Sequence, residues 1–262
     1  MLQFSANLSL LFTEVPLIDR FQQARAAGFE AVEIQFPYEL SAQTIKQQLQ
    51  QHELKLVLFN VPADTLLQGG EGLACVPEKQ HQFKQALEQA ARYADILSPN
   101  AINILPGRCL NPARLPEYLE TFRHNLYDAA ETFQQQGIKV VFEAVNTHDM
   151  PGFIIHSSRQ MLDVMAQLKH PALGLQYDIY HMQKMQEDCA GFLSRHMDKI
   201  AHIQFADCPG RGQPGTDQTD FSSLFRIISE SDYCGWTGAE YIPSGKTTDS
   251  LNWLRTYQPA TL

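Results

Sequence analysis

Short apolar runs alternate with longer amphipathic stretches from one end of the chain to the other. The short runs are rich in β-branched and aromatic residues, a composition that favours β-strands. They predict eight strands, at Leu2–Asn7, Ala31–Phe36, Leu54–Asn60, Ala101–Leu105, Lys139–Val145, Leu173–Tyr177, Ile200–Phe205 and Trp236–Tyr241.

Each predicted strand is followed by a stretch whose apolar positions recur with the period of an α-helix. Gly28 and Gly137 follow two of these stretches, and glycine is common just after a helix. Ser157 or Ser158 can cap the helix that begins near residue 158. The predicted helices are Leu17–Ala27, Ala42–His52, Glu78–Leu97, Pro116–Gln136, Ser158–Leu168, Gln183–His196, Phe221–Ser229 and Thr248–Tyr257.

Eight strand–helix units in 262 residues predict an α/β fold, a single (β/α)8 TIM barrel, because such barrels need about 250 residues. A doubly wound open sheet is the alternative. It normally carries a glycine-rich loop after its first strand, and Asn7–Glu14 contains no glycine. No linker or low-complexity segment divides the chain, so residues 1–262 are expected to form one domain.

Composition narrows the classes of function. The 20 Lys and Arg against 29 Asp and Glu give a net charge of −9, so we expect no nucleic-acid partner. The five cysteines are scattered and form no C-x-x-C, which argues against a disulfide scaffold and a cysteine zinc site. With no signal peptide and no apolar run of about 20 residues, we expect a cytoplasmic protein without a membrane partner.

Oxygen-bearing side chains stand at the ends of the last four predicted strands. In a TIM barrel the reactive groups lie where strands end, and Glu143, Asp178, Gln204 and Glu240 follow at intervals of about one βα unit. One such residue alone is more often an ion-pair partner or a cap. Three carboxylates that converge repel one another unless they are protonated or bound to a cation. The four together therefore predict a site for Mg²⁺ or Mn²⁺.

Further polar residues are candidates for substrate contact. Asn60 ends the third predicted strand, and His181 follows Asp178 by three positions. Arg211 lies in the Gly- and Pro-rich loop 209–221, where it either binds an anionic substrate through its planar guanidinium or is merely solvated. We expect His202 to be a hydrogen-bonded residue behind Gln204 rather than a ligand.

Other histidines and cysteines show no functional pattern. His148, His156 and His170 are expected at the surface. Cys208 and Cys234 are expected to be ordinary buried thiols.

Eight segments carry a family resemblance: FSANLSLLFTEVP (4–16), GFEAVEIQFPY (28–38), FNVPA (59–63), FEAVN (142–146), QYDIYHMQKM (176–185), HIQFAD (202–207), RGQPGT (211–216) and GWTGAEY (235–241). They resemble the hydroxypyruvate isomerase family, a branch of the xylose-isomerase-like barrels. The resemblance spans nearly the whole chain, and its most specific parts are FSANLSLLF and QYDIYHMQ. It implies a divalent metal held by Glu143, Asp178, Gln204 and Glu240, with the two glutamates as proton donor and acceptor. Sugar epimerases of the wider superfamily usually have His at the position of Gln204.

Loop sequences depart from the family pattern and leave the substrate open. Two acidic residues of the family pattern are Gln213 and Gln218 here, and a glycine of that pattern is Asp217. The resemblance implies interconversion of hydroxypyruvate and tartronate semialdehyde through an enediolate, on a small 2-oxo or hydroxy acid. A 2-oxo-tetronate isomerase and a ketose 3-epimerase are alternatives on the same site.

Two alternative hypotheses assign the protein to other classes of function. One is a metal-dependent phosphodiester hydrolase of the endonuclease IV type, which needs more histidine ligands and a basic groove. The other is a metal- or sugar-acid-binding protein without catalysis. The sequence also allows a homo-oligomer.

Overall fold

The computed structural model describes residues 2–257 of the chain. Within them, parallel strands close into a barrel in the order β1 to β8, and β8 pairs with β1. The predicted TIM barrel is therefore confirmed. The strands are β1 (Phe4–Asn7), β2 (Ala31–Ile34), β3 (Lys55–Asn60), β4 (Ala101–Asn103), β5 (Lys139–Glu143), β6 (Leu173–Asp178), β7 (Ile200–Phe205) and β8 (Thr237–Ala239).

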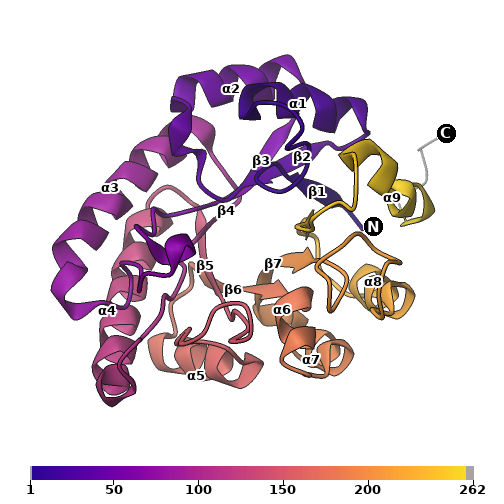
Figure 1. Ribbon diagram of the computed structural model, residues 1–262. Coiled ribbons are helices and arrows are strands. Elements are labelled where there is room, and N and C mark those ends of the chain that lie inside the picture. The colour runs from indigo at the N-terminus through magenta and orange to yellow at the C-terminus, as the bar shows by residue number, and fades with distance from the viewer. Residues whose placement is uncertain (1, 258–262) are drawn as a thin grey trace.

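Helices surround the barrel, and Figure 1 looks along it with the strands at the centre. Several strands end earlier than predicted, so Glu240 is the first residue after β8. Of the two serines predicted as possible N-caps of α5, Ser157 is the cap, and its hydroxyl accepts the N–H of Gln160. The helices are α1 (Leu17–Ala26), α2 (Ala42–Gln51), α3 (Gln80–Leu97), α4 (Leu115–Gln134), α5 (Ser158–Leu168), α6 (Ile179–Lys184), α7 (Cys189–His196), α8 (Phe221–Glu230) and α9 (Asn252–Tyr257).

The prediction of one helix over Gln183–His196 is wrong, because the structure has two short helices there. The carboxylate of Asp178 accepts the first N–H groups of α6. Gln186, with φ of 62°, takes the left-handed conformation and ends the regular backbone after α6. The carboxylate of Asp188 then caps α7 by accepting the N–H of Gly191. The first of these caps places Asp178 at the barrel mouth.

Aromatic packing joins the two ends of the described chain. The ring of Phe4 in β1 lies 5.8 Å from that of Phe205 in β7, 5.2 Å from Phe225 in α8 and 5.1 Å from Trp253 in α9. All three contacts are edge-to-face, a favourable arrangement for aromatic pairs. This cluster holds α8 and α9 against strands β7 and β1.

The inside of the barrel is polar over part of its length. Buried polar side chains from several strands hydrogen bond to one another across the interior. Because side chains alternate along a strand, these residues share the inward face while their neighbours pack against the helices. The inward-facing polar residues are Ser5, Asn7, Glu33, Asn103, Gln176, His202 and Gln204.

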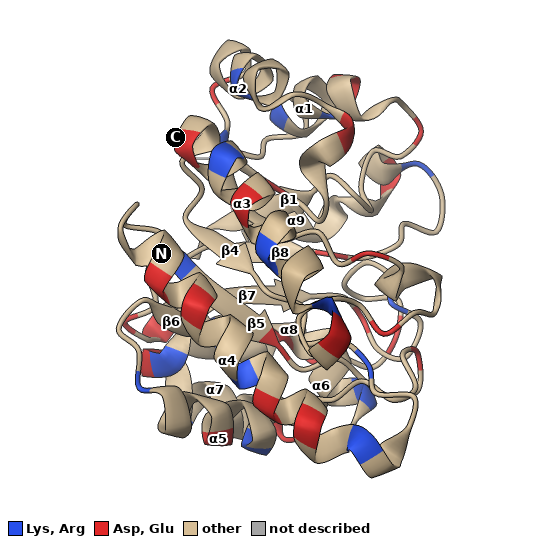
Figure 2. Ribbon diagram, turned by 90° about the vertical axis from the view of Figure 1, so that its left-hand side faces the viewer, with Lys and Arg blue, Asp and Glu red and all other residues tan. Residues whose placement is uncertain are grey.

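The outer surface carries charges of both signs. Figure 2 shows acidic and basic residues mixed along α4 rather than separated by sign. In residues 2–257 no helix has the length and apolar character needed to cross a lipid bilayer.

Candidate active site

The carboxyl ends of β5 to β8 bring the four predicted ligands to one side of the barrel mouth. Glu143 ends β5 and Asp178 ends β6, while Gln204 pairs in register with Asp178 on the next strand. Gln204 Nε2 lies 3.3 Å from Glu240 Oε1, beyond the end of β8. All four side chains are buried. The convergence expected from strand spacing is therefore present in the fold.

Burial and mutual repulsion make the carboxylates reluctant to ionise together. Burial raises the pKa of Glu143 well above its usual value, and the charges of Glu240 and Asp178 raise it further. Burial also raises the pKa of Asp178, against the opposing charge of Arg211. The pKa of Glu240 is raised to about 7 by burial, although Arg211 lowers it. A bound cation would favour the ionised form of all three groups.

His181 lies with the carboxylates rather than at the edge of the site. One ligand atom from each of Glu143, Asp178 and His181 lies within 4.8 Å of the other two. The backbone N–H groups of Tyr180 and His181 donate to Asp178 Oδ1, at 2.8 and 3.4 Å. The start of α6 therefore holds both Asp178 and His181 in place.

The hydrogen bonds of Asn146 define the protonation of His181. Asn146 Oδ1 accepts the backbone N–H of Asp149 at 2.8 Å, so its Nδ2 faces His181 Nδ1, 2.7 Å away. Nδ1 is therefore the acceptor, and Nε2 carries the proton toward Asp178 Oδ2 at 3.5 Å. Burial lowers the pKa of His181 well below its usual value, and Arg211 adds to this effect. His181 is thus a neutral donor.

Arg211 reaches into the site from the loop after β7. Its Nη2 lies 2.7 Å from Glu240 Oε2, and its guanidinium lies 5.1 Å from the centre of the Tyr180 ring. Only 23% of the Arg211 side chain is exposed. Of the two sequence interpretations, the solvated arginine is therefore wrong, because Arg211 faces the carboxylates.

The carboxylate of Asp207 holds the Arg211 loop in shape. Its Oδ2 accepts the backbone N–H groups of Gly215, Thr216 and Asp217, each at 2.9 Å. Its Oδ1 accepts the backbone N–H of Thr219, also at 2.9 Å. Burial raises the pKa of Asp207, but these hydrogen bonds outweigh burial and leave the pKa below its usual value. The ionised carboxylate of Asp207 therefore stabilises the conformation of the loop.

Asn60 is linked to Glu143 through a residue that the sequence analysis missed. Asn103 in β4 donates from Nδ2 to Glu143 Oε1 at 2.8 Å and to Asn60 Oδ1 at 3.2 Å. Glu143 Oε2 makes no hydrogen bond within the described part of the chain. Glu143 therefore keeps one oxygen available.

A cavity of about 140 Å³ lies over these groups. Its polar side includes Glu143, His181, Arg211 and Glu240, and Asn60 also lines it. Apolar side chains make up much of the remaining lining. Such a cavity suits a small polar molecule shielded from bulk water. Its apolar lining residues are Phe36, Leu66, Leu67, Leu105, Val145, Met150 and Phe153.

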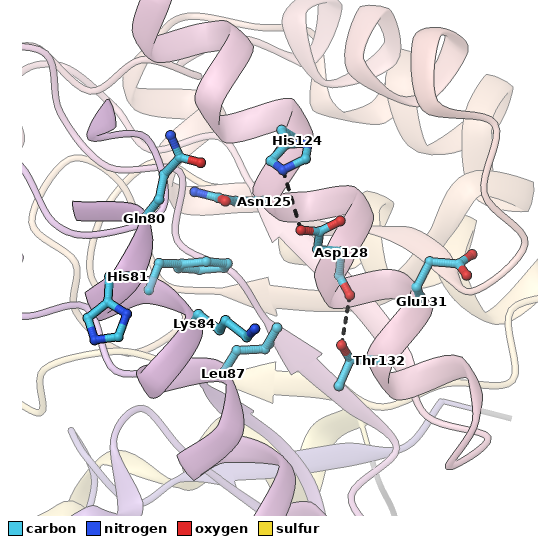
Figure 3. Close-up of a pocket in the computed structure, with 10 residues that line it drawn as sticks. Gln80, His81, Lys84, Leu87, His124, Asn125, Asp128, Glu131 and Thr132 are labelled. Atoms are coloured by element: carbon cyan, nitrogen blue, oxygen red, sulfur yellow. Dashed lines mark hydrogen bonds and ion pairs between the residues drawn. The ribbon is translucent and has the colours of Figure 1, made fainter. Parts of the chain in front are cut away.

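A second, more voluminous cavity of about 530 Å³ lies between α3 and α4, outside the barrel (Figure 3). In Figure 3, His124 contacts Asp128, at 3.5 Å, within α4. Thr132 also bonds within α4, because its Oγ1 donates to the backbone carbonyl of Asp128 at 2.8 Å. The contacts of His124 and Thr132 are both within α4. The residues that line this cavity include no cluster of buried carboxylates, so we place the candidate active site at the barrel mouth.

The sequence analysis missed three further residues beside the site, which are Glu33, Asn7 and Gln35. Asn7 Nδ2 and Gln35 Nε2 donate to Glu240 Oε1 at 2.8 and 2.9 Å. Glu33 lies below them, wholly buried in β2. A charged residue inside an otherwise apolar strand is a signal that could have revealed Glu33, since such groups are rarely buried without partners.

Some minor predictions are confirmed and others are wrong. His202 is buried and hydrogen bonded to Glu33, as expected, with 2.7 Å between Nε2 and Oε2. His148 is exposed and His156 half-buried, but His170 is buried because its ring pairs with Glu131 and packs beside Tyr127.

The two cysteines expected in the core are not buried. Cys208 is half-buried and Cys234 is exposed. Both follow the end of a regular element and lie in loops, where the pattern of apolar residues does not predict burial.

Comparison with known proteins identifies the family. Residues 21–257 match the xylose isomerase-like TIM barrel family. The chain is 38% identical to the hydroxypyruvate isomerase of Escherichia coli (strain K12) over 258 residues, covering 98% of this chain and 100% of that protein. It is 32% identical to the 2-oxo-tetronate isomerase of Haemophilus influenzae (strain ATCC 51907 / DSM 11121 / KW20 / Rd) over 256 residues, covering 98% and 99%.

A solved structure shows the same fold. The crystal structure of an AP endonuclease of family 2 from Brucella melitensis has a TM-score of 0.94 and 33% identity, covering 98% of this chain and 99% of that one. The chain belongs to the xylose isomerase-like TIM barrel family, which confirms the resemblance seen in the sequence. Within it, the protein is an isomerase.

Proposed function

We propose that the protein interconverts hydroxypyruvate and tartronate semialdehyde with the help of a divalent metal, Mg²⁺ or Mn²⁺. The observation that carries this proposal is a set of buried carboxyl groups at the barrel mouth. Glu143 lies close to Asp178, and Glu143 and Glu240 line a small cavity that Arg211 also lines. Relatives named hydroxypyruvate isomerase support the choice of substrate.

The residues present fit a hard divalent cation. Their oxygens are the donors such ions prefer. Burial, with repulsion between the carboxylates, raises the pKa values of the three carboxyl groups, and a cation among them would offset that cost of ionisation. Glu143, Asp178, Gln204 and Glu240 would hold the ion, with His181 beside it. A bound ion would polarise the substrate carbonyl and stabilise negative charge on neighbouring oxygens.

The chain's own groups would orient the substrate. Arg211 can bind the substrate carboxylate through two parallel hydrogen bonds. The neutral His181 can donate from Nε2 to a substrate oxygen. The apolar wall at Phe36, Leu105 and Phe153 would exclude water from the reacting carbons.

Two glutamates would move the proton between neighbouring carbons. Glu143 Oε2, the oxygen without a hydrogen bond, takes the proton from the hydroxymethyl carbon, and the electron pair forms an enediolate. Glu240, which must start the cycle protonated, gives its proton to the adjacent carbon, while the hydroxyl proton moves to the other oxygen. Glu143 is then protonated and Glu240 ionised, and exchange of protons with water returns both to their starting states. The product is the aldehyde. We assign Glu143 to the first step because both oxygens of Glu240 already accept hydrogen bonds.

Proton NMR in D₂O tests the proposal directly. Metal-loaded protein is incubated with hydroxypyruvate and, separately, with a 2-oxo-tetronate. We expect interconversion with solvent deuterium at the carbon that receives the proton, faster for hydroxypyruvate. A faster reaction of the 2-oxo-tetronate would reassign the substrate to that of the 32–34% identical relatives. No exchange with either compound, despite bound metal, would overturn the proposal in favour of a binding protein.

A further inference from the structure

Glu33 is a buried carboxylate that does not line the cavity. It lies inside the barrel and accepts hydrogen bonds from four side chains. Ser5 Oγ and His202 Nε2 donate to Oε2, at 3.3 and 2.7 Å. Asn7 Nδ2 and Gln204 Nε2 donate to Oε1, at 3.0 and 2.7 Å. Glu33 therefore makes its contacts with protein groups below the site and not with a substrate.

Strand β8, which is separated from β2 only by β1, leaves space for this carboxylate. A β-carbon at Gly238 in β8 would collide with Glu33 Oε2. Glycine at this position therefore matches a full-length glutamate on β2. The side chain of Glu33 fits between β8 and the amides of Asn7 and Gln204.

Two amides connect Glu33 to Glu240 at the barrel mouth. Asn7 Nδ2 donates to Glu33 Oε1 and also to Glu240 Oε1, at 2.8 Å. Gln204 Nε2 donates to the same two oxygens, at 2.7 and 3.3 Å. Asn7 Oδ1 accepts the backbone N–H of Ser9 at 3.0 Å, so the amide of Asn7 can face the carboxylates only through its nitrogen.

The same argument defines the orientation of Gln204. Its amide nitrogen faces two carboxylates, and turning the amide over would place its oxygen against them. Its Oε1 instead points to β6, where it accepts from Gln176 Nε2 at 2.6 Å. The amide oxygen is the atom of Gln204 that can bind a cation. It faces the neighbouring strand β6, whose last residue is Asp178.

We propose that Glu33 is a positioning residue that turns the oxygen of Gln204 toward the metal site and, through Asn7 and Gln204, holds Glu240 in place. This inference rests on the proposed function, because it concerns the residues that would bind the metal. Groups behind metal ligands commonly change metal affinity by about 10–100-fold when they are replaced.

The test measures metal affinity rather than turnover. Binding of Mn²⁺ to the metal-free protein is followed by the electron paramagnetic resonance signal of free Mn²⁺. The variants are Glu33→Gln, Gln204→Ala and the double variant, with Thr237→Val as the matched control. Thr237 is a buried residue of β8 whose hydroxyl makes no hydrogen bond in the described chain. Circular dichroism and thermal melting confirm that each variant is folded.

We expect Glu33→Gln to weaken Mn²⁺ binding by about 10–100-fold and Thr237→Val to leave it unchanged. If Glu33 acts largely through Gln204, Glu33→Gln has a much smaller effect in the Gln204→Ala background. If Glu33→Gln does not fold, Glu33→Asp provides the comparison, since it keeps the charge and shortens the reach to both amides.

The outcomes separate the two proposals. Unchanged affinity in Glu33→Gln overturns the role of Glu33 while the metal site stands. Equal fold-changes in both backgrounds overturn the action of Glu33 through Gln204. Failure of the wild-type protein to bind Mn²⁺ removes the metal site itself, and the positioning role is then wrong as well.

Discussion

Arg211 Nη2 lies 2.7 Å from Glu240 Oε2, and this ion pair forms part of the cavity wall. The arginine is the positive group that counters Glu240, and it lowers a pKa that burial raises. A substrate carboxylate would meet the same guanidinium. One residue therefore connects the charge of a proposed catalytic group to the binding of an anionic substrate.

Replacing Arg211 tests this connection. We expect Arg211→Met to raise KM and to lower kcat/KM by about 10–100-fold, since a hydrogen bond to a charged group contributes about 1.5–3 kcal/mol. Arg211→Lys keeps the charge but not the planar pair of donors, and should recover only part of the loss. Steady-state kinetics with hydroxypyruvate measure both effects. An unchanged KM in Arg211→Met would exclude the arginine from substrate binding.

The two glutamates should be separately essential for turnover. Glu143→Gln and Glu240→Gln keep the shape of each side chain but remove the acid–base group. We expect each to lower kcat by about 10²–10⁴-fold, the usual contribution of a positioned acid or base. Thermal melting serves as the control for folding. Near-normal turnover in either variant would remove that residue from proton transfer.

Asp207 should affect the loop more than the barrel. Asp207→Asn places an amide among backbone N–H groups that now donate to a carboxylate, a mismatch that costs about 1–3 kcal/mol when a buried partner is lost. We expect faster proteolysis within residues 208–219 and a lower kcat/KM. Asp217→Asn is the matched control, because exposed Asp217 accepts one backbone N–H, that of Gly210. Equal proteolysis of both variants would contradict the anchoring role.

The stabilisation of the fold by a bound metal ion should depend on pH. The pKa of Glu240 is raised from 4.5 to about 7, so its protonated form stabilises the metal-free fold below pH 4.5. That stabilisation is lost as the pH rises through 7. The lowered pKa of His181 acts in the opposite sense in acid, so the comparison is made at each pH with and without metal.

Differential scanning fluorimetry at pH 5 and pH 8 measures this linkage. We expect Mn²⁺ to raise the melting temperature more at pH 8, because at pH 5 protons compete for the carboxylates. Asp178→Asn is the control and should reduce the shift at pH 8. An equal shift at both pH values would indicate that the ion binds elsewhere.

The sequence by itself determined the order of elements and the residues at strand ends. Apolar runs of strand length alternate with helical patterns, and local periodicity is enough to place each unit. Because parallel strands in a barrel all end at one face, Glu143, Asp178, Gln204 and Glu240 could be expected to meet. A break such as the one at Gln186 was missed, since one residue in a left-handed turn barely changes the helical pattern.

Only the tertiary structure decided what lies behind those residues. Asn7 and Glu240 are separated by 233 positions and meet because β8 closes onto β1. Glu33 and Asn103 each appear as a single polar residue in an apolar strand, and the sequence does not tell whether such a residue faces the interior or the helices. Barrel closure and strand register set that direction, and they depend on contacts between distant parts of the chain.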